Sequence, residues 1–190
     1  MTSLVRRASR QTLFFRPSSS AVGVVSLFAL PLSVRSALGS GVVGFSGSRS
    51  VVPAVLPLVL SGVGSESVVF VGCASGVDAV VRSAVPSARV FRVVGAGRRA
   101  FALRSVRFVQ ALASSGGVLF SFPSGACPAV VVPSSVSSVC FCGGGSGSWA
   151  SLAFALGCGV PCCVWLGGVV PPASFGLVAV GGGWWASLPF

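Results

Sequence analysis

Residues 108–190 carry no charged side chain, because Arg107 is the last charged residue of the chain. Such a stretch either packs most of its helices and strands against other elements or meets lipid. Residues 149–170 are long enough to span a bilayer, so a membrane-associated protein is one alternative. Gly157, Gly159 and Pro161 fall where a buried helix would end and a buried strand begin, which favours a packed core instead.

The amino-acid composition excludes several kinds of catalytic and metal site. Hydrophobic residues make up 53% and charged residues 8% of the 190 residues, which excludes disorder of the whole chain and allows one domain with its own core. The formal net charge is +11 and every basic residue is Arg, a balance that favours anionic partners. The chain has no His and no Lys, so Ser-His-Asp triads, imidazole metal sites and Schiff-base lysines are excluded. Two acidic residues cannot supply a three-carboxylate magnesium site, and we expect a binding protein without a cofactor rather than an enzyme.

The seven cysteines occur in Cys-x-Cys and Cys-Cys spacings, and no Cys-x-x-Cys pair is present. The usual patterns of zinc sites and thioredoxin-like redox sites are therefore missing. We expect small buried thiols in a reducing compartment, hence a cytoplasmic location, and no metal site.

The first 38 residues differ from the rest of the chain. They are rich in Arg and Ser and contain no acidic residue, which is similar to an organelle transit peptide. The apolar run at residues 21–32 is too short to span a bilayer, although it would suit the core of a signal sequence. We expect a basic tail over residues 1–38, either disordered or used for targeting, and a single domain over residues 39–190.

From residue 39 onward, short β-branched runs alternate with Gly/Ser turns and helical segments. The pattern predicts strands at about 41–45, 68–71, 89–95, 118–122 and 138–142, with a sixth after residue 160. It predicts helices at about 54–60, 77–85 and 98–115, and another after the glycines at 143–148. This alternation, with continuously apolar strands, predicts an α/β fold, a Rossmann-like three-layer sandwich with a mostly parallel central sheet.

Three of the predicted turns share one arrangement, at residues 45–49, 72–78 and 143–148. Each follows an apolar strand and precedes a helix, so all three emerge at the carboxyl edge of a parallel sheet. Glycines let the backbone approach a ligand, and the free amides at a helix start attract phosphate. The sequence therefore predicts a phosphate-binding site where the three turns meet.

The motifs "GFSGSRS", "GCASGVDAVVR" and "GSGSWASLAFALGCGVPCCVW" resemble successive motifs of the Rossmann-like domain of the DNA-processing protein A (DprA/Smf) family, over residues 41–166. That family belongs to a superfamily that also holds the lonely-guy phosphoribohydrolases. The resemblance implies a nucleotide or single-stranded nucleic acid as partner, bound by the turns, by Arg49 and by a basic helix with Arg99 and Arg107. The candidate phosphate-binding residues are Gly47, Ser48, Arg49, Gly72, Ala74, Ser75, Gly76, Asp78, Arg98, Arg104, Gly144, Gly145, Ser146, Gly147 and Ser148.

The chain departs from the superfamily pattern at the residue that the phosphoribohydrolases need for catalysis. Aligning the phosphoribohydrolase turn on the third motif places Ser151 where those enzymes have a catalytic Glu, and a hydroxyl cannot replace that carboxylate. A nucleotide-processing enzyme therefore stays an alternative that would depend on Asp78. A homodimer is also left open.

A few single side chains have a structural or a functional interpretation. Asp78 would stabilise the amide end of its helix, or orient a ribose hydroxyl or a loop. Trp149 would stack on a base, Trp184 and Trp185 would close the sheet, and Glu66 would be exposed.

Overall fold

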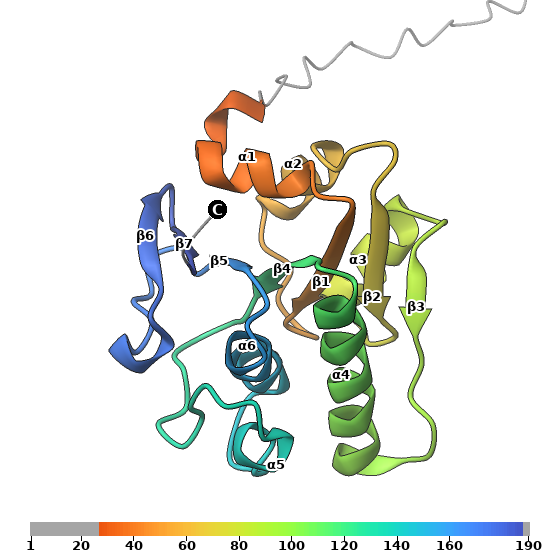
Figure 1. The fold of residues 1–190 in the computed structure, drawn as a ribbon, viewed down its shortest axis with the longest axis vertical. Coiled ribbons are helices and arrows are strands. Elements are labelled where there is room, and N and C mark those ends of the chain that lie inside the picture. Colours follow the sequence, from red (N-terminus) through yellow and green to blue (C-terminus); the bar gives the residue numbers. More distant parts are fainter. Residues whose placement is uncertain (1–26, 188–190) are drawn as a thin grey trace, which may run out of the picture.

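The computed structural model describes residues 27–187, which form one seven-stranded sheet with the order β3-β2-β1-β4-β5-β7-β6 (Figure 1). The first five strands run parallel, and the last two are antiparallel to their neighbours. The strands are β1 (Val42–Gly47), β2 (Val68–Gly72), β3 (Arg89–Phe91), β4 (Val118–Phe122), β5 (Cys162–Trp165), β6 (Val178–Gly181) and β7 (Trp184–Ala186). The predicted Rossmann-like α/β fold with a mostly parallel sheet is confirmed.

Helices cover both faces of the sheet. The helices are α1 (Leu32–Leu38), α2 (Leu56–Ser61), α3 (Val77–Ala84), α4 (Gly97–Ser114), α5 (Ser137–Cys140) and α6 (Gly147–Gly157), with 3-10 turns η1 (Leu27–Ala29) and η2 (Ala173–Phe175). One buried cluster joins α1, α2 and α3 to the sheet, and the other joins α4 and α6 to it. Strand β4 serves both faces, since Phe120 belongs to the first cluster and Leu119 to the second. Alternate residues of a strand point to opposite faces, so the central strands are buried on both sides.

The strand order creates a crevice beside β1. From β1 the chain moves through β2 to β3 at one edge, and then returns across the sheet to β4 and β5 on the other side of β1. The order therefore reverses between β1 and β4. In open parallel sheets ligands bind outside the carboxyl ends of the strands at this reversal.

The predicted strand at residues 138–142 is wrong. Residues 137–140 form the short helix α5, and the strand that pairs with β4 is β5 at Cys162–Trp165. Cys140 lies in the α4–α6 core with Val131, so this segment covers α6 instead of joining the sheet. The other predicted strands and helices match β1 to β4, α2, α3, α4, α6 and β5 to within a few residues at their ends.

The membrane span considered at residues 149–170 is also wrong, because those residues contain most of α6 and the whole of β5. Across residues 27–187, no helix combines the length and the apolar character needed to cross a bilayer.

The packed part of the chain begins before residue 39. Leu30, Val34, Ala37 and Leu38 are buried in the α1–α3 core cluster, so α1 belongs to the domain rather than to a tail. The expectation of a disordered or targeting segment at residues 1–26 falls outside the described residues.

Candidate functional site

A cleft of about 830 Å³ opens at the carboxyl ends of β1 and β4. It lies at the crevice that the strand order predicts, and such a volume is typical of sites for small molecules. Its walls come from the turn after β1, the start of α3, the first two turns of α4, and the loop from α5 to α6. The lining residues include Gly47, Ser48, Arg49, Ala74, Asp78, Arg98, Arg104 and the stretch from Gly144 to Ser148. Of the predicted site residues, Gly72, Ser75 and Gly76 do not line the cleft.

Ser48 holds the first turn in shape. Its backbone amide donates to the carbonyl of Phe122 at 2.9 Å. Its buried Oγ accepts from the amides of Ser50 at 3.3 Å and Val51 at 3.1 Å, and contacts Ser124 Oγ at 3.0 Å. These bonds fix the direction in which Arg49 leaves the turn.

Arg49 is exposed and lies over α4. Its guanidinium carbon is 4.7 Å from the ring centroid of Phe101, a cation–π contact. Its Nη2 is 4.0 Å from the place where a Cβ on Gly147 would lie. Arg49 therefore reaches across the cleft to the first residue of α6.

Asp78, at the start of α3, accepts a hydrogen bond from the amide of Ala74 at 3.1 Å and pairs with Arg104 Nη1 at 3.2 Å. Burial raises the pKa of Asp78, and the charges of Arg104 and Arg82 oppose that rise. Arg82 donates to the carbonyls of Gly72 at 2.7 Å and Ala74 at 3.0 Å. The second turn is thus held by an internal charge network, and the structural role expected for Asp78 is joined by an ion pair that the sequence did not reveal.

Gly72, Ser75 and Gly76 act through the backbone. A Cβ on Gly72 would collide with Arg104 Nη1, so only glycine leaves room for the ion pair. Gly76 has a φ of 66° and lies against the carbonyl of Ser48, which also accepts from the amide of Val77 at 3.0 Å. Ser75 Oγ donates to the carbonyl of Arg49 at 2.9 Å. These contacts bind the second turn to the first rather than to a ligand.

The third turn follows α5 instead of a strand, yet it still opens a helix at the cleft. Gly144 and Gly145 pack against Val130 and Pro128, and a side chain at either position would meet those residues at 2.9 Å. Ser146 precedes α6 without capping it, because its Oγ lies 2.8 Å from Ser148 Oγ. The start of α6 therefore faces the cleft without a side-chain cap.

Ser151 and Trp149 both make hydrogen bonds near the start of α6. Ser151 Oγ donates to the carbonyl of Gly147 at 2.8 Å, so its hydroxyl is used within α6. Trp149 has 0% exposure, and its Nε1 donates to the carbonyl of Gly125 at 3.2 Å. The prediction that Trp149 stacks on a base is wrong, because the ring belongs to the core beside Phe175.

The prediction from sequence missed some lining residues, and besides Gly72, Ser75 and Gly76 it named Arg107, which also lies outside the lining. Phe101, which is not among the predicted site residues, supports Arg49 in the cleft wall. Phe141 and Cys142 line the cleft as well, and only the correct placement of α5 could have revealed them. Arg107 is absent from the lining and donates to the carbonyl of Arg92 at 2.7 Å.

The charge of the cleft is strongly positive. Four of its lining residues are arginines, Arg49, Arg98, Arg99 and Arg104, and Asp78 is the acid among them. Glu66 is the other acidic residue of the chain. It is exposed in the loop before β2, at the amino ends of the parallel strands and so away from the cleft at their carboxyl ends. The chain therefore has no further acid that could neutralise the cleft.

The cysteines of the chain all lie among the described residues and form no disulfide. All seven cysteines are free, with Cys140, Cys162 and Cys163 buried and Cys142 exposed. Within residues 27–187, no three His, Cys, Asp or Glu side chains lie close enough together to hold a metal ion.

Comparisons of the chain with protein-family models, with curated proteins and with solved structures found no match. The resemblance to the DNA-processing protein A family therefore depends on the sequence motifs alone.

Proposed function

We propose that the cleft binds the phosphate groups of a nucleotide or of single-stranded nucleic acid, as a DprA-like binding domain would. The observation that carries the proposal is the approach of the Arg49 guanidinium to the first residue of α6. The amino end of a helix carries a partial positive charge and free amides. Arg49 thus adds a full positive charge beside a partial one.

An anion is the group that stabilises both at once. Backbone amides at a helix start bind phosphate oxygens, and Arg binds phosphate with a planar two-pronged fork. One face of the Arg49 guanidinium rests on the Phe101 ring, which holds the guanidinium in place. The two recognition elements are therefore arranged in advance.

The same site supports binding more than catalysis. Asp78 is the acid of the cleft, and its Oδ2 already accepts from Ala74 and Arg104. Ser151 stands where the phosphoribohydrolases have their catalytic Glu, and its hydroxyl is engaged within α6.

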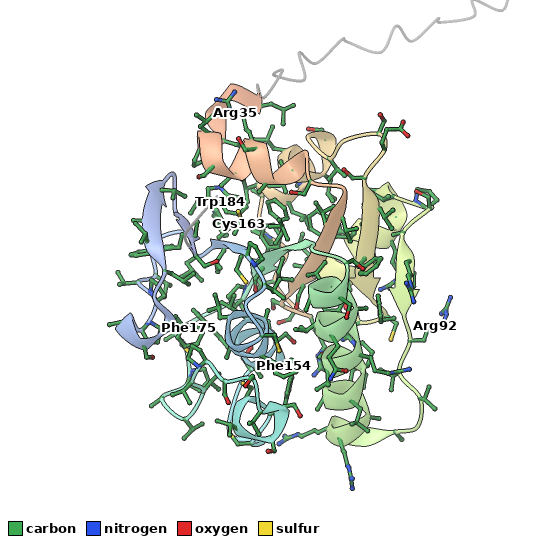
Figure 2. The ribbon with its side chains drawn as sticks, in the orientation of Figure 1. Arg35, Arg92, Phe154, Cys163, Phe175 and Trp184 are labelled. Carbon is green, nitrogen blue, oxygen red and sulfur yellow. The ribbon has the colours of Figure 1, made fainter. Side chains whose placement is uncertain are left out.

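The experiment is calorimetric titration of the protein with AMP, ATP and a short oligothymidylate at two salt concentrations. We expect saturable binding of at least one of these that weakens with salt, and we expect Arg49→Ala to weaken it by about tenfold or more. Arg92→Ala is the matched control, because Arg92 is exposed at the outer edge beyond β3 and points away from the body of the molecule (Figure 2). Absence of binding to all three ligands, or an equal loss in both variants, would refute the proposal.

A further inference from the structure

A second group of positive charge lines the cleft at the first turn of α4. Arg98 and Arg99 follow directly after Gly97, the first residue of this helix, and both are exposed. Neither has an ion-pair partner among residues 27–187. We propose that the ligand carries two or more linked phosphates, as the polyphosphate chain of a nucleoside di- or triphosphate does, and that Arg98 and Arg99 hold the outer ones. This inference rests on the proposed function.

The position of these arginines is unfavourable without a ligand. Helix α4 begins after Ala96, which provides no side-chain cap, and its first turn contains no acidic residue. Basic side chains near the amino end of a helix are repelled by the helix dipole. The cleft therefore holds basic side chains beside the amino ends of two helices: Arg49 beside α6, and Arg98 and Arg99 on α4. A bound anion would offset the electrostatic repulsion at each helix end.

The two places are close together. Phe101, which supports Arg49, lies three residues after Arg98 on the same helix. Residues three apart lie on one face of a helix, about one turn from each other. A ligand whose phosphate is held by Arg49 and α6 would thus have its next phosphates beside Arg98.

Arg104 lies three residues after Phe101, about one turn further along α4, and lines the cleft at 9% exposure. Its Nη1 is used by Asp78, while its buried Nε has no hydrogen-bond partner. A buried donor without a partner is costly. An acceptor oxygen of a ligand in the cleft would satisfy this donor, and the observation is independent of the helix ends.

The charge balance favours a polyphosphate over a monophosphate. The Arg104–Asp78 pair is neutral, which leaves Arg49, Arg98 and Arg99 unbalanced in the cleft. A single phosphate monoester carries about −1.5 to −2 charges at neutral pH. Bound at Arg49 and α6, it would leave Arg98 and Arg99 without an anionic partner.

The distribution of the remaining arginines favours a compact ligand over a nucleic-acid strand. A groove for single strands carries basic residues along the path of the backbone. Within residues 27–187, the arginines outside the cleft are Arg35, Arg82, Arg89, Arg92 and Arg107, and none of them lines it. The row of arginines that lines the cleft is therefore not continued beyond it as a lined groove.

The test compares AMP, ADP, ATP and a short oligothymidylate by calorimetric titration at fixed ionic strength. We expect affinity to rise from AMP to ATP by about tenfold or more. The double variant Arg98→Ala/Arg99→Ala should lose this preference and bind ATP only about as tightly as it binds AMP. Arg92→Ala/Arg107→Ala removes the same charge outside the cleft and should retain the preference for ATP.

The outcomes separate this inference from the proposed function. Equal affinity for AMP and ATP in the wild-type protein overturns the polyphosphate inference and leaves phosphate binding intact. Tighter binding of the oligothymidylate than of ATP, lost in Arg98→Ala/Arg99→Ala, overturns it in favour of a strand. Failure of every ligand to bind overturns the proposed function itself.

Discussion

Arg104 has two roles, because its guanidinium lines the cleft and also neutralises Asp78. The resemblance assigned Gly72 to phosphate binding from its motif and Arg104 from the basic helix. It could not reveal that Gly72 lacks a side chain to leave room for Arg104, since that contact joins β2 to α4 across the fold. A motif residue can thus shape the cleft through a neighbour.

The burial of Asp78 predicts an unusual dependence of stability on pH. Its pKa is raised above the ordinary value of 3.8, chiefly by burial, so the folded state holds this proton more tightly than the unfolded chain. The stability that Asp78 contributes is complete below pH 3.8 and is lost as pH rises through the folded-state pKa. We expect the free energy of unfolding to fall with rising pH in this window, as measured by urea titration.

Two variants isolate this effect. Asp78→Asn should remove the slope, while Glu66→Gln should keep it, since Glu66 is exposed and is the other acidic side chain of the chain. The absence of His leaves this pH range with few other titrating groups. Stability that rises with pH in the wild-type protein would contradict the assignment.

The elements were predicted well where hydrophobic period and turn residues agree. Strands β1, β2 and β4 are continuous apolar runs that end in glycine or Pro/Ser turns, and α4 carries its apolar residues on one face. Residues 138–142 failed because a short run of Val, Cys and Phe has no period of its own. Whether it joins the sheet depends on β5, which pairs with β4 from a distant part of the chain.

Helix α6 depends on a close approach that the sequence does not display. A Cβ on Gly157 would collide with the backbone of Ser134 and Ser135. We expect Gly157→Ala to lower the free energy of unfolding by about 1 to 3 kcal/mol, since neighbouring backbone has to shift. Gly41→Ala is the matched control, because a Cβ there meets nothing within 4 Å. Equal stability of the two variants in urea would show that the contact is absent in solution.

At the scale of the whole molecule, the boundary of the domain was placed too late in the sequence. Helix α1 looked like the end of a basic tail because its apolar residues follow a segment rich in Arg and Ser. Its inner face nevertheless packs into the core with Val59, Phe45 and Phe120. Tertiary packing, rather than any signal in α1 itself, decides its place.

Two leucines of α1 test this boundary. Leu38 is 1% exposed and Leu32 is 71% exposed. We expect Leu38→Ala to destabilise the protein by about 2 to 5 kcal/mol, and Leu32→Ala to change stability by no more than about 0.5 kcal/mol. Thermal or urea unfolding of the full chain measures both changes in stability. A loss for Leu38→Ala as small as that for Leu32→Ala would show that α1 is not part of the packed domain.

Leu38 near the start of the described chain and Trp184 in its last strand lie in the same core cluster. During synthesis α1 leaves the ribosome long before β7. The apolar face of α1 therefore stays without its packing partner Trp184 until most of the domain has been made. Parallel sheets with such distant contacts fold late and expose apolar surface in the meantime. The nascent chain is therefore most prone to aggregation between the emergence of α1 and that of Trp184.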